Sequence, residues 1–314
     1  MATNGEDQNQ PLKATWLGMC VLTTFLFVVV QAGTAVVVVF FHAYLSGNSG
    51  VLFTNEPSTY LYTENTISVF HMASFVAQLA TLIVFFFLYH RICIKPMKNP
   101  GTVIDIKSRE NRSPSGRKKT LRRRPFSLPP PSVVVWSVLT GVILCVFGNE
   151  LVLVTEYFFP QIIAEYRDMM EQAGFHQGSI VLLAAILFAP ISEELLCRGI
   201  VQHYAMKFSS RFWVANTVQA LMFAIIHFNW VQGTYAFIIG LVLGWLRTRY
   251  QTIWAPIIVH FVFNIMALTQ LGYLLSQIPD RLGFHLAILG LAIAAMVTLI
   301  AIIGRSGSPF KDTK

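Results

Sequence analysis

Two adjacent carboxylates and an arginine interrupt an apolar stretch of the sequence. Glu193, Glu194 and Arg198 lie within FAPISEELLCRGIVQHY, residues 188–204. A charged side chain near the centre of a membrane helix costs about 2.5–3.5 kcal/mol on insertion scales, so three of them need a structural or chemical reason. On a helix Glu194 and Arg198 are four residues apart and share a face, in the favourable order of acid before base. This spacing predicts an ion pair with a structural role.

Glu193 gains nothing from that pair, because it is rotated by about 100° around the same helix. Unless another helix supplies a partner, its carboxylate is buried without one. A carboxyl group in that position can take up and give back a proton, so Glu193 is a candidate general base.

Two later apolar stretches carry polar side chains at helical spacing. Phe223 precedes His227 by four residues, and His260 precedes Asn264 by four, which places each pair on one helix face. His and Asn side chains are costly in lipid and are expected to face the interior of a helix bundle. A single intramembrane histidine is as often structural as catalytic. Two imidazoles, a carboxylate and an amide together can hold a water for attack or bind a metal ion.

The composition indicates which elements must position these groups. Hydrophobic residues make up 54% of the 314 residues and charged residues 12%, against about 25% charged in ordinary soluble domains. The apolar residues fall in blocks long enough to span a bilayer. The sequence therefore predicts an all-α fold, a polytopic membrane helical bundle of about eight transmembrane helices. The predicted spans are 16–45, 67–90, 133–158, 179–204, 212–230, 232–249, 253–273 and 284–304.

Charge divides the chain into four predicted parts. Residues 91–124 hold twelve Lys or Arg against two acids. A basic run can bind nucleic acid, but between two spans the positive-inside rule favours a cytoplasmic loop in contact with anionic lipid. Counting spans from that loop places both termini in the cytoplasm of a multi-pass protein of the cell membrane. The parts are a two-span N-terminal segment (1–90), the basic loop (91–132), a catalytic membrane core (133–275) and a last span with its tail (276–314).

The last predicted span, 284–304, is free of Asp, Glu, Lys and Arg. A span without charge suits a position facing lipid. We therefore expect this helix to lie at the edge of the bundle.

Taken together, the polar motifs resemble those of the CPBP family, the CAAX protease and bacteriocin-processing group, also called Abi. The resemblance covers about residues 135–275 and rests on the order and the internal spacing of three motifs. These are Glu193-Glu194-x-x-x-Arg198, Phe223-x-x-x-His227 and His260-x-x-x-Asn264.

The resemblance implies an intramembrane endopeptidase with its site inside a helical bundle. It implies that Glu193 is the principal catalytic residue, that His227 and His260 position a water, and that Asn264 stabilises the oxyanion. A divalent metal such as zinc, held by His227, His260 and Glu193, is a further expectation that the resemblance leaves open. The supporting positions match Glu194, Arg198 and Phe223.

Three classes of function remain open from the sequence. An endopeptidase acting on a membrane-associated protein or peptide precursor is favoured, because no motif residue is missing. The alternatives are a non-catalytic membrane scaffold of the same fold and a proton-coupled transporter, which would carry repeats with polar spans in both halves. The expected partners are membrane lipids and a protein or peptide substrate, and no nucleic acid. Simple loops favour a bacterial source, and with it a substrate other than a prenylated CAAX protein.

Overall fold

In the computed structural model, residues 10–45, 64–95, 128–173, 179–269 and 281–306 are described. Every regular element in these ranges is a helix, which confirms the predicted all-α membrane bundle. The predicted basic loop lies mostly in 96–127, outside the described residues. The chain ends, on which the predicted cytoplasmic termini depend, lie outside them too.

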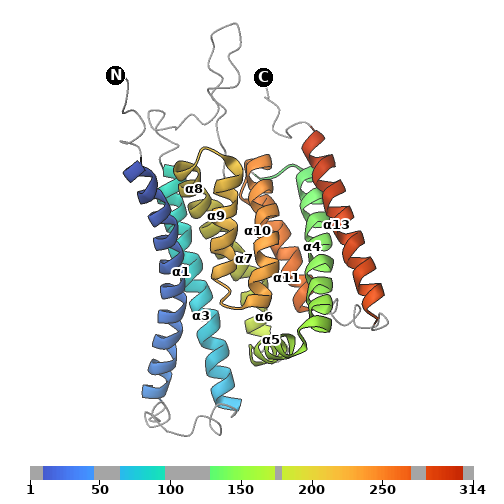
Figure 1. Ribbon diagram of the computed structural model, residues 1–314. Helices are drawn as coiled ribbons and strands as arrows, with labels where there is room; N and C mark the ends of the chain where they lie inside the picture. The colour runs from blue at the N-terminus through green and yellow to red at the C-terminus, as the bar shows by residue number, and fades with distance from the viewer. Residues whose placement is uncertain (1–9, 46–63, 96–127, 174–178, 270–280, 307–314) are drawn as a thin grey trace.

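The N-terminal part forms two long helices that lie side by side at one edge of the bundle (Figure 1). They are α1, Gln10–Leu45, and α3, Glu64–Tyr89, which continues into the π-helical turn η3, His90–Ile94. The first helix runs through Gly33 without interruption, and its 36 residues are about 54 Å long, well beyond a bilayer core of about 30 Å.

The opposite edge is formed by α4, Pro131–Phe158, and α13, Leu282–Arg305 (Figure 1). Between them in the chain, α5, Pro160–Gln172, lies across the end of the bundle at which α4 ends. An ion pair between Arg167 of α5 and Glu156 of α4, at 2.5 Å, holds this turn.

The segment that carries the paired carboxylates is a bent, continuous helix. It consists of α6, Ser179–Leu183, the π-helical turn η5, Ala184–Phe188, α7, Ala189–Glu194, the π-helical turn η6, Leu195–Val201, and α8, Gln202–Phe208. Thiols from the N-terminal helices reach backbone carbonyls of the π-helical turn η6. Cys20 of α1 donates to the carbonyl of Val201 (3.6 Å), and Cys93 of η3 to that of Gly199 (3.5 Å).

Three further helices complete the middle of the bundle: α9, Phe212–Ile225, α10, Trp230–Tyr250, and α11, Trp254–Leu268. The predicted hairpin of spans 212–230 and 232–249 is present, but its first helix ends at Ile225. Phe228 then adopts φ 51°, and the side chain of Asn229 caps α10 by accepting from the backbone N–H of Gln232 at 3.0 Å.

By length and composition, five described helices could cross a membrane: Ala14–Leu45, Val69–Ile94, Pro131–Phe158, Ile180–Phe208 and Leu282–Arg305. Two shorter apolar helices, α9 and α11, have 14 and 15 residues, fewer than the roughly 20 needed for a full span. The multi-pass prediction is therefore confirmed, whereas the count of eight is not.

Candidate active site

The carboxylate of Glu193 faces the imidazole of His260. Glu193 Oε2 of α7 and His260 Nε2 of α11 are 3.8 Å apart, and the side chains are 14% and 7% exposed. This distance is too long for a direct hydrogen bond but short enough for an electrostatic contact. Two motifs that lie 67 residues apart in the sequence thus meet in one place.

The neighbouring carboxylate, Glu194, receives two donors at the same oxygen. Its Oε1 atom lies 2.9 Å from Arg198 Nη1 and 2.9 Å from His260 Nδ1, and the side chains of Glu194 and Arg198 are fully buried. The ion pair predicted from the spacing is present. Because the carboxylate accepts from Nδ1–H of His260, the neutral ring carries its lone pair on Nε2, toward Glu193.

Phe223 packs at the centre of the polar group. The guanidinium of Arg198 lies 4.2 Å from its ring centroid in a cation–π contact. Its ring also makes edge contacts with the imidazoles of His227, at 4.9 Å between centroids, and His260, at 5.5 Å. The aromatic ring therefore contacts all three cation-forming side chains.

His227 lies in the turn after α9, not within the helix as the predicted span 212–230 implied. Its Nδ1 atom is 2.7 Å from the carbonyl oxygen of Phe223. A carbonyl only accepts, so Nδ1 of His227 carries the hydrogen, and the neutral ring has its lone pair on Nε2. The two site histidines thus share one tautomer.

Asn264 lies one turn beyond His260 on α11, and its side-chain amide donates to the carbonyl of Ala185 at 2.8 Å. That carbonyl is available because the residue five positions further along the chain is Pro190 of α7, which has no N–H to donate. The observed contact ties α11 to the π-helical turn η5. An amide has two N–H donors, so this bond uses one of them.

The predicted metal ligands Glu193, His227 and His260 do not meet as a set. Within the described ranges, no three His, Cys, Asp or Glu side chains form a group that could hold a metal ion. Glu193 and His260 are close, and Phe223 separates His260 from His227.

Several polar contacts between the described helices were missed from the sequence. Tyr235 of α10 packs against Phe263 of α11, at 6.1 Å between ring centroids, and its hydroxyl lies 3.2 Å from that of Tyr166 of α5. A second buried pair joins Glu150 of α4 to His285 of α13, with 2.8 Å between Oε2 and Nδ1. The signal for Glu150 was present, because it too is an acidic residue within an apolar span.

The site thus brings carboxylates and imidazoles together inside a bundle of apolar helices. Residues 176–266 match the Rce1-like family, described as type II CAAX prenyl endopeptidase. No curated protein and no solved structure matches the chain. The matched segment contains all three motifs, and it confirms the predicted resemblance to the CAAX protease group. The chain is thus a multi-pass membrane protein in which residues 176–266 are similar to this family.

Proposed function

We propose that this protein is a glutamate-dependent intramembrane endopeptidase that hydrolyses a peptide bond of a membrane-associated protein or peptide precursor. The observation that carries the proposal is the contact of Glu193 with a histidine whose other nitrogen is held by a buried carboxylate. A catalytic base must lie beside a group that can help to hold a water, and Glu193 faces the Nε2 atom of His260 at 3.8 Å.

The proposed reaction begins with water at Glu193. The carboxylate takes one proton from the water, and the Nε2 lone pair of His260 accepts a hydrogen bond from the hydrogen that stays on the oxygen. The oxygen attacks the peptide carbonyl carbon, and the resulting oxyanion is stabilised by the amide of Asn264. When the C–N bond breaks, Glu193 returns its proton to the leaving amine, so the net reaction consumes one water.

Glu194, Arg198 and Phe223 act as positioning residues in this proposal. The carboxylate of Glu194 fixes the tautomer and orientation of His260, and Arg198 balances the charge of Glu194. No step is routed through a metal ion, because the described residues do not bring three metal ligands together. Metal dependence stays a prediction, to be read from activity after chelation.

The substrate class follows from the family and the environment of the site. The matched family is described as a prenyl endopeptidase, which supports a substrate already attached to the membrane. Prenylated and non-prenylated peptides differ in their lipid group but present the same peptide carbonyl to Glu193. The proposal therefore covers both prenylated and non-prenylated substrates, and the comparison of protein termini described below distinguishes them.

The deciding experiment compares protein N- and C-termini in membranes of cells that express the wild type or Glu193→Gln at equal levels. We expect new termini with the wild type and none with the variant. The control is Glu165→Gln, which removes an exposed carboxylate from α5 and should leave the cleavage products unchanged. Identical termini in wild type and Glu193→Gln would overturn the proposal in favour of a non-catalytic scaffold.

A further inference from the structure

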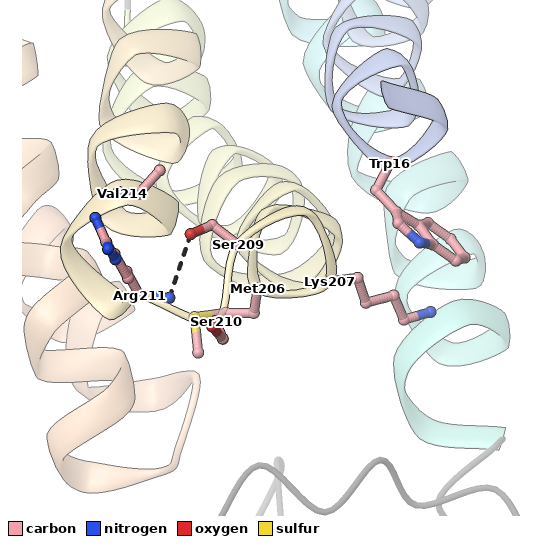
Figure 2. A pocket seen from close by; sticks show the side chains of 7 residues that line it. All are labelled: Trp16, Met206, Lys207, Ser209, Ser210, Arg211 and Val214. Atoms are coloured by element: carbon pink, nitrogen blue, oxygen red, sulfur yellow. Dashed lines mark hydrogen bonds between the residues drawn. The ribbon is translucent and has the colours of Figure 1, made fainter. Parts of the chain in front are cut away.

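A pocket of about 610 Å³ opens between the ends of α1, α8 and α9 (Figure 2). None of the residues that line it belongs to the candidate active site. It lies at the end of the bundle where α1 begins and α13 ends (Figure 1), the end that charge counting predicts to be cytoplasmic. Its volume is in the range typical of small-molecule sites. The lining residues are Trp16, Met206, Lys207, Ser209, Ser210, Arg211 and Val214.

Two cations line this pocket, Lys207 with its charged end on the side of Trp16 and Arg211 with its charged end on the side of Val214 (Figure 2). Lys207 Nζ lies 4.3 Å from the ring centroid of Trp16 and 5.6 Å from that of Tyr204. An ammonium group in cation–π contact keeps N–H donors for a further partner. Neither Lys207 nor Arg211 forms an ion pair with a carboxylate in the part of the chain that the structure describes.

Hydroxyl groups between the cations add further donors. Ser209 and Ser210 form the connection from α8 to α9, and the Oγ atom of Ser209 accepts from the backbone N–H of Arg211 at 3.2 Å. This bond holds the connection in a tight turn and leaves the Ser209 O–H free to donate. Two cations and two hydroxyls are donors suited to the oxygens of a phosphate group.

An apolar stripe leads from the pocket along α9. Val214 lines the pocket, and Leu221 and Ile225 follow it at intervals of seven and four residues, on one helix face. Their side chains are 39%, 46% and 47% exposed within the protein. Next to Val214, the indole of Trp213 is 63% exposed, as expected for an anchor at a membrane–water boundary.

We propose that this pocket binds the phosphate of an anionic phospholipid, with an acyl chain lying on the α9 stripe. The cations and hydroxyls account for the phosphate, and the stripe accounts for an attached apolar chain. A free phosphate ion would use the first set of groups and not the second. The bound lipid would link α1, outside the matched family segment, to α8 and α9 within it.

The test uses the purified full-length protein in a neutral detergent. Phosphatidylglycerol, phosphatidylcholine and inorganic phosphate are each titrated, and the midpoint of thermal unfolding is recorded. We expect the midpoint temperature of unfolding to rise, and to reach a plateau, with phosphatidylglycerol but not with phosphatidylcholine or inorganic phosphate. Equal rises with phosphatidylcholine would overturn the requirement for an anion, and equal rises with inorganic phosphate would overturn the assignment to a lipid.

The variant Lys207→Gln/Arg211→Gln should raise the concentration of phosphatidylglycerol at half-saturation by about thirtyfold. Each cation near a membrane surface contributes to the attraction of anionic lipid, so losing two weakens binding. The matched control, Arg91→Gln/Arg305→Gln, removes two exposed cations from the same end of the bundle outside the pocket. It should bind like the wild type. Unchanged binding in the Lys207/Arg211 variant would overturn the proposal.

Two further variants distinguish a loss of lipid binding from a loss of folding. Lys207→Arg/Arg211→Lys keeps both charges and should bind within a few-fold of the wild type. Leu221→Asn keeps the cations and interrupts the stripe, so it should weaken binding of phosphatidylglycerol. If Leu221→Asn binds the lipid like the wild type, the acyl-chain part of the proposal is wrong.

Discussion

Glu194 holds His260 through a hydrogen bond of 2.9 Å from the imidazole Nδ1–H to the carboxylate, and both side chains are buried. The bond joins α7 to α11 across 66 positions of the chain. It orients the second ring nitrogen toward Glu193, so the carboxylate of Glu194 determines which atom of His260 Glu193 faces.

Replacing Glu194 should therefore damage the fold as well as the site. Glu194→Gln leaves the buried guanidinium of Arg198 without its counter-charge, and breaking a buried ion pair typically costs about 3–5 kcal/mol. We expect a lower free energy of unfolding in mixed micelles and a loss of proteolysis. The double variant Glu194→Gln/Arg198→Met should recover part of the stability and none of the activity. A single variant as stable as the wild type would contradict the structural role.

Replacing Glu193 should lower the cleavage rate without lowering the stability of the fold. Its Oε2 atom is buried without a hydrogen bond among the described groups, so an amide in its place should fold at least as well. General acid–base catalysis contributes about 10²–10⁴-fold to rate, and we expect Glu193→Gln to lose activity by about that factor. Unfolding curves and cleavage rates of one purified sample provide the measurement. Full activity in a folded variant would exclude Glu193 as the base.

The sequence predicted the helices well because membrane spans are encoded in the residue types of long segments. Every predicted span corresponds to a helix, and the edges differ by only a few residues for most of them. The spans predicted at 212–230 and 253–273 each end five residues early, at Ile225 and Leu268. The end of the first depends on the left-handed backbone of Phe228 and the cap by Asn229, which hydropathy does not report.

The site was predicted as a set of residues but not as a set of bonds. Helical spacing predicted the pair of Glu194 and Arg198, because both lie on one helix. The bond of Glu194 to His260 and that of Asn264 to Ala185 join different helices. Such contacts depend on how the helices are offset along the bundle, which local patterns leave undetermined.

The last helix, expected to face lipid, does lie at the edge of the bundle, but one of its polar groups is buried. His285 is 4% exposed and hydrogen bonded to Glu150, which is fully buried on α4. Removing the imidazole leaves a buried carboxylate whose other described hydrogen bond is a long one, 3.5 Å from Asn149. We expect His285→Leu to destabilise the protein by about 3–5 kcal/mol.

The control for this pair is Glu150→Leu/His285→Leu, in which no charge is left unpaired. A double-mutant cycle on unfolding in micelles should show that the two substitutions are coupled and that the double variant recovers most of the loss. Additive effects of the two changes would argue against the pair as the contact that holds α13 to α4.

Gly244 should not tolerate a side chain. A Cβ atom there would overlap Asn216 Oδ1 and Gln219 Nε2 of α9, two side chains that also hydrogen bond to α10. Gly244→Ala should destabilise the hairpin of α9 and α10 by about 1–3 kcal/mol. Gly290→Ala is the matched control, because a Cβ at Gly290 on α13 meets nothing within 4 Å. Equal melting temperatures for the two variants would contradict the close packing at Gly244.

Alkaline pH should weaken the attachment of α5 to the bundle. Burial raises the pKa of Tyr166 above its usual value of 10, while its hydrogen bond to Tyr235 opposes this rise. A phenol whose pKa is higher in the folded protein stabilises the fold fully below pH 10, and this contribution is lost as pH rises through the folded-state pKa. The free energy of unfolding should therefore fall above about pH 10 in the wild type. In Tyr166→Phe it should start lower, because the bond is absent, and fall less steeply between pH 9 and pH 11. Parallel pH profiles for wild type and variant would show that the phenol of Tyr166 does not set this dependence.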